Sequence, residues 1–121
     1  MRVGAGQSPM GRIVAFHQRP PDPEAWLDYY RNVHIPIVRR IPGLQNIRWG
    51  QVLRTSDGTP APCWLISDVY FKDVDALETA LGTPEMKEAF DDTSKFILRG
   101  NVKIMFCEAK DTAPLHEPQS V

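Results

Sequence analysis

The sequence predicts an α+β fold of the ferredoxin-like βαββαβ type, and three observations carry this prediction. Runs rich in β-branched and aromatic residues alternate with runs of helical periodicity in the order strand, helix, strand, strand, helix, strand. Clusters of proline, glycine and aspartate separate these runs. The chain has 121 residues, which is enough for one core and does not require a second. Two split βαβ halves of this kind form a four-stranded antiparallel sheet with the helices on one face.

The first half of the fold is a strand followed by a helix. The apolar run RIVAFH predicts a strand over residues 12–17, and the prolines that follow it indicate a loop. Asp22 is expected to cap a helix that has Pro23 at its first position. Pro42 and Gly43 are expected to end this helix. Its buried face is indicated by apolar residues that recur every three or four positions, namely Trp26, Tyr30, Val33 and Ile37.

Pro36 lies inside this predicted helix, two residues after His34. A proline inside a helix costs about 3 kcal/mol, because it has no N–H and its ring crowds the carbonyl four residues earlier. The carbonyl of Asn32 therefore loses its partner, and helical geometry is disfavoured at Ile35. We expect the helix to kink, or to leave its regular course, beside His34.

A β-hairpin is predicted from residues 44–55 and 63–71, which are joined by the turn-forming segment SDGTPAP. Apolar and polar residues alternate in the first run, and the second run is rich in aromatic and β-branched residues. Asp68 lies in the centre of the second run, where an unpaired carboxylate would be costly. Arg48 is a candidate partner, although the sequence leaves the register of the hairpin open.

The second half continues with helical segments and a final strand. Asp73 is expected to cap a helix that Gly82 ends, and Thr83 with Pro84 is expected to begin another. The run NVKIMFCEA at residues 101–109 supplies the fourth strand. The buried face of the second of these helices is predicted to hold Met86, Ala89, Phe90, Thr93 and Ile97.

The acidic residues and histidines form no metal-binding motif. Asp91 and Asp92, with Glu88, are interpreted as a solvated face of the last helix. The three histidines are scattered, without an HxxxH or paired acidic motif, so no metal ion is expected. One of them, His116, lies in a polar C-terminal segment and is interpreted as solvated.

Composition limits the partners and the compartment. The 14 basic and 15 acidic residues give a net charge of −1, so neither nucleic acid nor a membrane is an expected partner. The apolar runs are too short for a membrane span, no signal peptide is visible, and Cys63 and Cys107 are interpreted as reduced core thiols. These features favour a cytoplasmic protein. Residues 1–11 and 109–121 are expected to be flexible segments flanking a single domain at residues 12–108.

One face of the predicted sheet has no cover within the chain. Both helical regions lie on one side, so the alternate residues of every strand face outward. Exposed apolar sheet faces usually mark an interface, and two copies packed sheet against sheet would cover this one. The sequence therefore predicts a homodimer.

The sequence resembles the EthD-like family of dimeric α+β barrel proteins over residues 12–108. The resemblance rests on the His-x-Pro of His34 and Pro36 with Ile37 after it, on the Pro-Gly pair that ends the helix, and on the aromatic-ended strand VYF. It implies a homodimeric barrel that binds a small organic molecule in a cleft between sheet and helices, lined by His34. The wider superfamily includes cofactor-free monooxygenases, muconolactone isomerases, dehydratases and haem-degrading enzymes, so the fold alone does not select a reaction.

The candidate site is centred on His34, whose imidazole has an ordinary pKa near 6.5 and is suited to exchange a proton at neutral pH. With the resemblance added, we expect His34 to act as a general base, with Tyr30 or His17 orienting a substrate oxygen. No cofactor is expected. The ligand is expected to be small and aromatic, hydrophobic or lactone-like. Apolar residues expected to bind it are Trp26, Ile37, Trp49, Tyr70 and Phe90.

Three alternatives remain open at this point. His34 could be a hydrogen-bonded structural residue and Pro36 merely the cause of a bend. The protein could bind a hydrophobic small molecule without chemistry. A haem could be bound through His34, as in related barrels.

Overall fold

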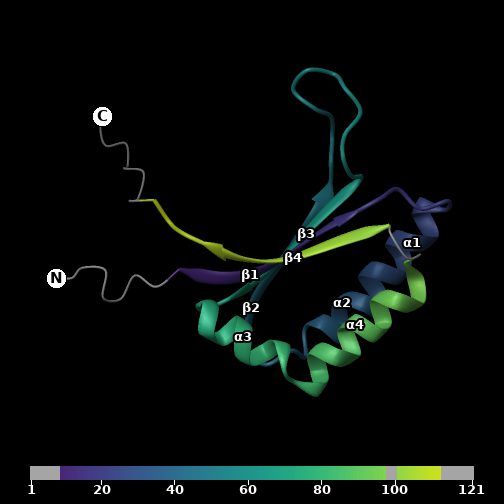
Figure 1. The fold of residues 1–121 in the computed structure, drawn as a ribbon. Coiled ribbons are helices and arrows are strands. Elements are labelled where there is room, and N and C mark those ends of the chain that lie inside the picture. Colours follow the sequence, from purple (N-terminus) through teal and green to yellow (C-terminus); the bar gives the residue numbers. More distant parts are fainter. Residues whose placement is uncertain (1–8, 98–100, 113–121) are drawn as a thin grey trace, which may run out of the picture.

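A computed structural model of the chain describes residues 9–97 and 101–112 and has two layers, a sheet and a layer of helices on one of its faces (Figure 1). The four strands are β1 (Met10–His17), β2 (Leu44–Gln51), β3 (Leu65–Phe71) and β4 (Val102–Ala109). They form one antiparallel sheet in the order β2-β3-β1-β4. The predicted ferredoxin-like α+β fold is therefore confirmed. Strands β1 and β4 reach slightly beyond the expected domain bounds, whereas residues 1–8 and 113–121, and with them His116, lie outside the described residues.

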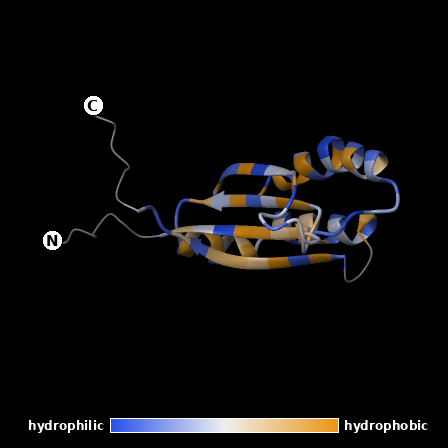
Figure 2. Ribbon diagram, turned by 90° about the horizontal axis from the view of Figure 1, so that it is seen from above, coloured by the Kyte–Doolittle hydropathy of each residue, from blue (hydrophilic) through white to orange (hydrophobic). Residues whose placement is uncertain are grey.

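The register of the sheet separates two faces. Ile13 on β1 is opposite Val69 on β3 and Phe106 on β4, so these three side chains share the face that the helices cover. The residues that alternate with them, such as Val14 opposite Asp68 and Met105, face away from the helices. Figure 2 shows that the strands carry both hydrophobic and hydrophilic residues. Strand β2 ends earlier than predicted, at Gln51, and the loop between β2 and β3 projects from the sheet (Figure 1). Leu53, which was expected to belong to the strand, lies in that loop and is 88% exposed.

The hairpin register corrects the expected partner of Asp68. Arg48 is directly opposite Asp68 on β2, but the ion pair is formed by Arg12 of β1, whose Nη1 lies 3.3 Å from Oδ1 of Asp68. Both side chains lie on the sheet face that the helices leave uncovered. Asp68 is directly opposite Val14, so the ion pair lies beside an apolar side chain near the middle of this face.

The helices are α1 (Pro23–Tyr29), the π-helical turn η2 (Tyr30–His34), α2 (Ile35–Val38), α3 (Val74–Leu81) and α4 (Pro84–Phe96). The predicted caps are confirmed. Asp22 accepts a hydrogen bond from Ala25 N at 3.2 Å, and Asp73 accepts one from Ala76 N at 2.8 Å. Thr83 caps α4 in the same way. None of the described helices has the length and apolar character that crossing a membrane would need.

The π-helical turn next to Pro36 corrects the predicted buried face of the first helix. The N–H of Ile35 donates to the carbonyl of Tyr30, five residues earlier, where an α-helix would pair residues four apart. This wider turn inserts one residue into the helical repeat, so Val33 is 39% exposed and His34 is buried in its place. Beyond the turn the buried residues are Ile35 and Val38, and helix α2 ends at Val38, before the predicted stop at Pro42 and Gly43.

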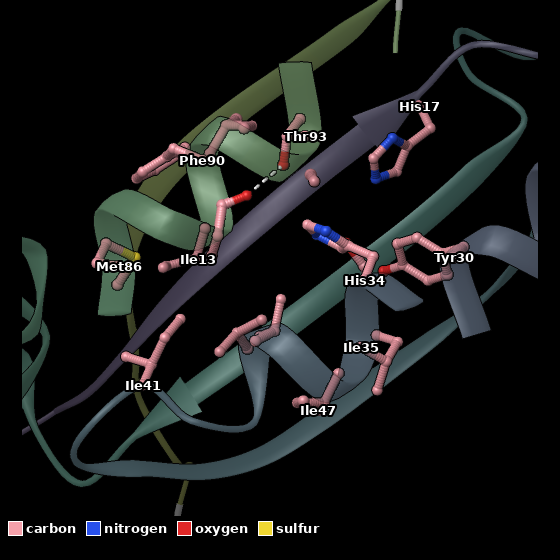
Figure 3. A pocket seen from close by; sticks show the side chains of 16 residues that line it. Ile13, His17, Tyr30, His34, Ile35, Ile41, Ile47, Met86, Phe90 and Thr93 are labelled. Atoms are coloured by element: carbon pink, nitrogen blue, oxygen red, sulfur yellow. Dashed lines mark hydrogen bonds between the residues drawn. The ribbon is translucent and has the colours of Figure 1, made fainter. Parts of the chain in front are cut away.

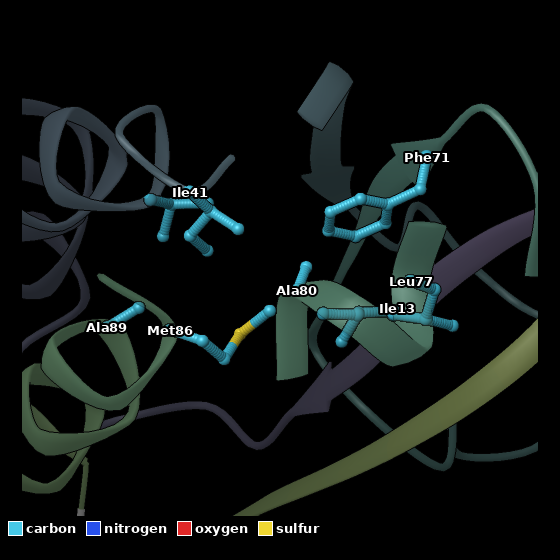
Figure 4. Close-up of a cluster of buried hydrophobic side chains, with 8 residues drawn as sticks. Ile13, Ile41, Phe71, Leu77, Ala80, Met86 and Ala89 are labelled. Atoms are coloured by element: carbon cyan, nitrogen blue, oxygen red, sulfur yellow. The ribbon is translucent and has the colours of Figure 1, made fainter. Parts of the chain in front are cut away.

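The core lies between the sheet and the helices and has two parts. The larger cluster joins β1, β3, α2, α3 and α4 (Figure 4) and consists of Ile13, Val38, Ile41, Phe71, Leu77, Ala80, Met86 and Ala89. The smaller cluster consists of Trp26, Tyr30, Ile35 and Leu65. Strand β1 and helix α3 approach closely at Gly11, where a Cβ would lie 2.7 Å from Cβ of Leu77. The two clusters leave a gap between them that becomes the candidate site.

Candidate active site

A cavity of about 60 Å³ lies between the sheet and the helical elements η2, α2 and α4 (Figure 3). Its lining is mostly apolar and includes Ile13, Ala15, Ile35, Val38, Ile41, Ile47, Val69, Met86, Ala89, Phe90 and Ile104. The polar members of the lining are His17, Tyr30, His34, Ser67 and Thr93. The three residues expected to act in catalysis therefore line one cavity, His17 from β1 and both Tyr30 and His34 from η2.

His34 is paired with the carboxylate of Asp92, which was expected to be solvated. Its Nδ1 lies 2.9 Å from Oδ2 of Asp92 on α4, and the two side chains are only 10% and 3% exposed. Oδ1 of the same carboxylate accepts a hydrogen bond from the hydroxyl of Tyr29 at 2.7 Å. Asp92 therefore joins two residues of the first helical region to the last helix.

The interpretation of Asp92 as solvated was wrong, whereas Asp91 and Glu88 are indeed exposed. Asp92 follows Met86 and Ala89 at intervals of three residues, which places it on the buried face of α4. That spacing is the signal from which its burial could have been predicted. The run of acidic residues around it concealed this signal.

The environment of His34 sets its charge and its tautomer. Burial lowers the pKa of His34 and outweighs the opposite effect of Asp92, so the ring is neutral at neutral pH. A carboxylate oxygen can only accept, and the proton of the neutral ring is therefore assigned to Nδ1. This leaves Nε2 with a lone pair, and it forms no hydrogen bond with the described residues.

The orientation of the His34 ring is fixed by its neighbours. Tyr30, one turn earlier, stacks on it with ring centres 5.5 Å apart and planes inclined at 27°. Phe96 of α4 packs against it at 5.0 Å. The π-helical turn brings His34 to this position, because a regular α-helix would place Val33 there.

His17 lies at the end of β1 and faces His34 across the cavity (Figure 3). It is 4% exposed, and its Nδ1 is buried without a hydrogen-bond partner among the described residues. The ring packs edge-on against Trp26 and Tyr30, with ring centres 5.1 Å and 5.8 Å away. Burial, with a smaller contribution from His34, lowers the pKa of His17 to about 4, so this imidazole is also neutral at neutral pH.

Tyr30 is 3% exposed. Burial raises the pKa of Tyr30 to about 12, although a hydrogen bond with Ser67 acts in the opposite direction. The phenol is therefore protonated at neutral pH and is a hydrogen-bond donor rather than a base.

Of the five residues expected to bind a ligand, only Phe90 lines this cavity. Trp26 and Trp49 pack against Tyr30 behind the cavity wall, with ring centres 4.8 Å and 5.2 Å from it. Ile37 packs against the larger core cluster. Tyr70 is opposite Arg12 on the uncovered face of the sheet, which removes it from the cavity.

The acidic, cysteine and histidine side chains of residues 9–97 and 101–112 contain no group of three or more placed to hold a metal ion. Cys63 and Cys107 are both free, the first buried and the second partly exposed.

This fold and this site define a class of small ferredoxin-like α+β proteins with a histidine–aspartate pair in a cavity between sheet and helices. Within that class the chain belongs to the EthD family, because the model of the EthD domain matches residues 18–100. An uncharacterized 11.0 kDa protein from the thcB-thcC intergenic region of Rhodococcus erythropolis is 27% identical over 105 residues, which cover 87% of this chain and all of that protein. The predicted family resemblance is thereby confirmed.

Solved structures share the fold of this chain. A crystal structure of an ethyl tert-butyl ether d (EthD) family protein from Bacillus halodurans C-125 is 28% identical, with a TM-score of 0.73 over 82% of this chain and 97% of that one. The hydroxynitrile lyase of Passiflora edulis shares the fold at 13% identity, with a TM-score of 0.66 over 88% and 98% of the two chains. SnoaB, a cofactor-independent oxygenase from Streptomyces nogalater, shares it at 16% identity, with a TM-score of 0.58 over 88% and 99%.

Proposed function

We propose that this protein is an enzyme that binds a small hydrophobic, aromatic or lactone-like molecule and removes a proton from it without a cofactor, with His34 as the general base. The main observation that supports this proposal is the hydrogen bond between Nδ1 of His34 and Asp92. It leaves Nε2 as the basic atom of a neutral ring in the wall of an apolar cavity. A group with these properties can accept a proton from a substrate at neutral pH.

Asp92 has two effects on this step. It holds the imidazole in the tautomer that exposes a lone pair at Nε2, and its charge stabilises the imidazolium that forms when the proton is accepted. The hydroxyl of Tyr29 keeps the second carboxylate oxygen hydrogen-bonded, so the carboxylate itself stays fixed. The arrangement therefore favours a reversible transfer between substrate and Nε2.

Isomerisation, dehydration and oxygenation of an activated phenolate each begin with proton removal, so one base serves all three reaction types. A lyase and a cofactor-independent oxygenase have this fold, which supports the proposal that the cavity is an active site. Haem binding receives no support from the site, because a haem is far larger than a cavity of about 60 Å³.

Exchange of substrate protons for deuterium tests the proposal without knowledge of the pathway. Purified protein is incubated in D₂O with a panel of phenols, lactones and cyclic ketones, and loss of acidic C–H signals is followed by NMR. We expect exchange of at least one compound, and a decrease of about 10²- to 10⁴-fold in its rate for His34→Gln. If compounds bind but none exchanges, the result would instead support the alternative that the protein binds a small molecule without chemistry. Equal exchange by wild type and His34→Gln would exclude His34 as the base.

We also propose that the protein acts as a cytoplasmic homodimer. The sheet face opposite the helices carries Val14, Phe16, Ile66 and Met105 around the ion pair of Arg12 with Asp68. No described residue of the chain packs over this face as the helices do over the other. A second copy placed sheet against sheet would cover it.

A further inference from the structure

Three polar side chains of the cavity gather at one end. His17, Tyr30 and His34 lie together near the end of β1, whereas Ile41 and Met86 lie at the other end (Figure 3). Ser67 of β3 is hydrogen-bonded with Tyr30. A ligand that fills such a cavity has one polar group and an apolar remainder. The volume of about 60 Å³ offers room for roughly four to six atoms of water size.

His17 offers a hydrogen-bond donor at the polar end. Its Nδ1 is sealed from solvent and has no partner among the described residues. A buried N–H without an acceptor is rarer and costlier than a buried lone pair without a donor, so the proton of the neutral ring is assigned to Nε2. The flanking rings of Trp26 and Tyr30 prevent the imidazole from turning toward another partner. The two histidines thus present opposite functions, with N–H at Nε2 of His17 and a lone pair at Nε2 of His34.

The charges around the cavity disfavour an anionic ligand. The described residues that line it include no lysine, arginine, aspartate or glutamate. The carboxylate of Asp92 lies behind His34 and would repel an anion. A neutral acceptor is the group that a lone N–H donor in such surroundings can bind.

We infer that the cavity takes a small neutral carbonyl compound, a ketone or lactone, and that His17 donates a hydrogen bond from Nε2 to its carbonyl oxygen. This inference rests on the proposed function and specifies its substrate class. In the reaction, the bond between hydrogen and the carbon next to the carbonyl breaks, the proton passes to Nε2 of His34, and the electron pair moves onto the carbonyl oxygen. The hydrogen bond from His17 strengthens as that oxygen becomes negative, so His17 is a catalytic residue.

Binding of three matched probes tests the substrate class. Cyclopentanone carries the carbonyl, methylenecyclopentane replaces its oxygen by a CH₂ group, and cyclopentanecarboxylate carries a negative charge. We expect the wild-type protein to bind cyclopentanone about tenfold more tightly than methylenecyclopentane, because one hydrogen bond distinguishes these two probes. Cyclopentanecarboxylate should also bind more weakly than cyclopentanone, because Asp92 repels its negative charge. The ¹⁵N resonance of Nε2 of His17 should shift when cyclopentanone is added and stay in place with methylenecyclopentane.

Two variants assign the preference to His17. His17→Phe retains an aromatic ring without a donor and should bind cyclopentanone and methylenecyclopentane equally. His17→Gln retains an N–H donor and should restore part of the preference. If His17→Phe does not fold, the ¹⁵N shift of the wild-type ring and the His17→Gln variant still decide the question. Equal binding of the three probes, absence of cyclopentanone binding, or an unchanged preference in folded His17→Phe would overturn the inference.

Deuterium exchange at the carbons next to the carbonyl separates this inference from the proposed function. His34→Gln should keep the preference for cyclopentanone and lose the exchange. If wild-type protein shows the preference and the shift of His17 but no exchange of any ketone or lactone, the substrate class stands and the proposed proton transfer fails. If exchange occurs but the preference does not depend on His17, the proton transfer stands and the inference about His17 fails.

Discussion

Nδ1 of His34 lies 2.9 Å from Oδ2 of Asp92, although 58 positions separate the two residues in the sequence. This contact connects the π-helical turn η2 to helix α4 behind the cavity wall that His34 forms. It is buried, and it determines which nitrogen of the imidazole carries the proton. The expected activity therefore depends on a residue from the opposite half of the fold.

Asp92→Asn should change the tautomer of His34 while preserving the shape of the site. An asparagine can rotate its NH₂ group toward Nδ1, which moves the ring proton to Nε2 and removes the lone pair that faces the cavity. We expect proton exchange to fall by about 10²- to 10⁴-fold. The ¹⁵N resonances of the His34 ring report the tautomer directly. Asp91→Asn, at an exposed neighbouring position, is the matched control and should change neither the tautomer nor the rate; a wild-type tautomer in Asp92→Asn would contradict the assignment.

Tyr29→Phe should destabilise the protein by about 1 to 2 kcal/mol, because it deletes a hydrogen bond to a buried carboxylate and adds no cavity. The bond joins the Tyr29 hydroxyl to Oδ1 of Asp92 at 2.7 Å, and it raises the pKa of Tyr29. The free energy of unfolding is measured by urea titration. Ser94→Ala, which removes an exposed bond to the carbonyl of Phe90, should change it by less than about 0.5 kcal/mol. Equal effects of the two substitutions would show that Tyr29 does not restrain Asp92.

His17 should make the folded protein less stable as the pH falls from 7 to 5. The pKa of His17 is about 4 in the folded protein and near 6.5 when unfolded, so the unfolded chain binds more protons between these values. The contribution of the neutral His17 to the free energy of unfolding is fully present above pH 6.5 and is lost as the pH falls toward 4. The loss attributable to His17 between pH 7 and pH 5 is about 2 kcal/mol. Urea titrations at both pH values should show this difference in wild type and a smaller one in His17→Gln; an equal pH dependence would contradict the burial of a neutral His17.

The fold was predictable from the sequence because its signals are local. Asp22, Asp73 and Thr83 each cap a helix where a proline or an acidic residue follows, and these caps depend on residues three positions apart. The alternation in the strands likewise fixes which residues share a face. Pro36 indicated where the first helix departs from regular geometry.

The site was less predictable because it depends on the register of distant elements. The periodicity from Trp26 assumed a uniform α-helix, and the one residue added by the π-helical turn exchanged Val33 for His34 on the buried face. Asp92 can pair with His34 only because α4 lies beside η2. Asp68 pairs with Arg12 rather than Arg48 because β1 is paired with β3. Such contacts join residues that no local pattern relates.

Phe16→Glu should convert the proposed dimer into a monomer. Phe16 is opposite Ile66 on β3 and Lys103 on β4, on the sheet face that the helices leave uncovered, so a carboxylate there would lose its water if two sheets pack together. Removing a carboxylate from water costs several kcal/mol even beside a lysine, which predicts a dissociation constant at least about 100-fold higher.

Light scattering coupled to size-exclusion chromatography measures the effect on the mass. Wild type should elute with twice the mass of one chain and Phe16→Glu with the mass of one chain. Lys87→Glu is the control, because it also makes the protein more negative but on the helical side of the molecule, where Lys87 is exposed on α4. It should leave the mass unchanged. A monomeric wild type, or a Phe16→Glu variant that keeps the wild-type mass, would place the interface elsewhere or exclude it. Because the cavity lies on the helical side of the sheet, binding of cyclopentanone by the monomeric variant would further show that one chain suffices to form the site.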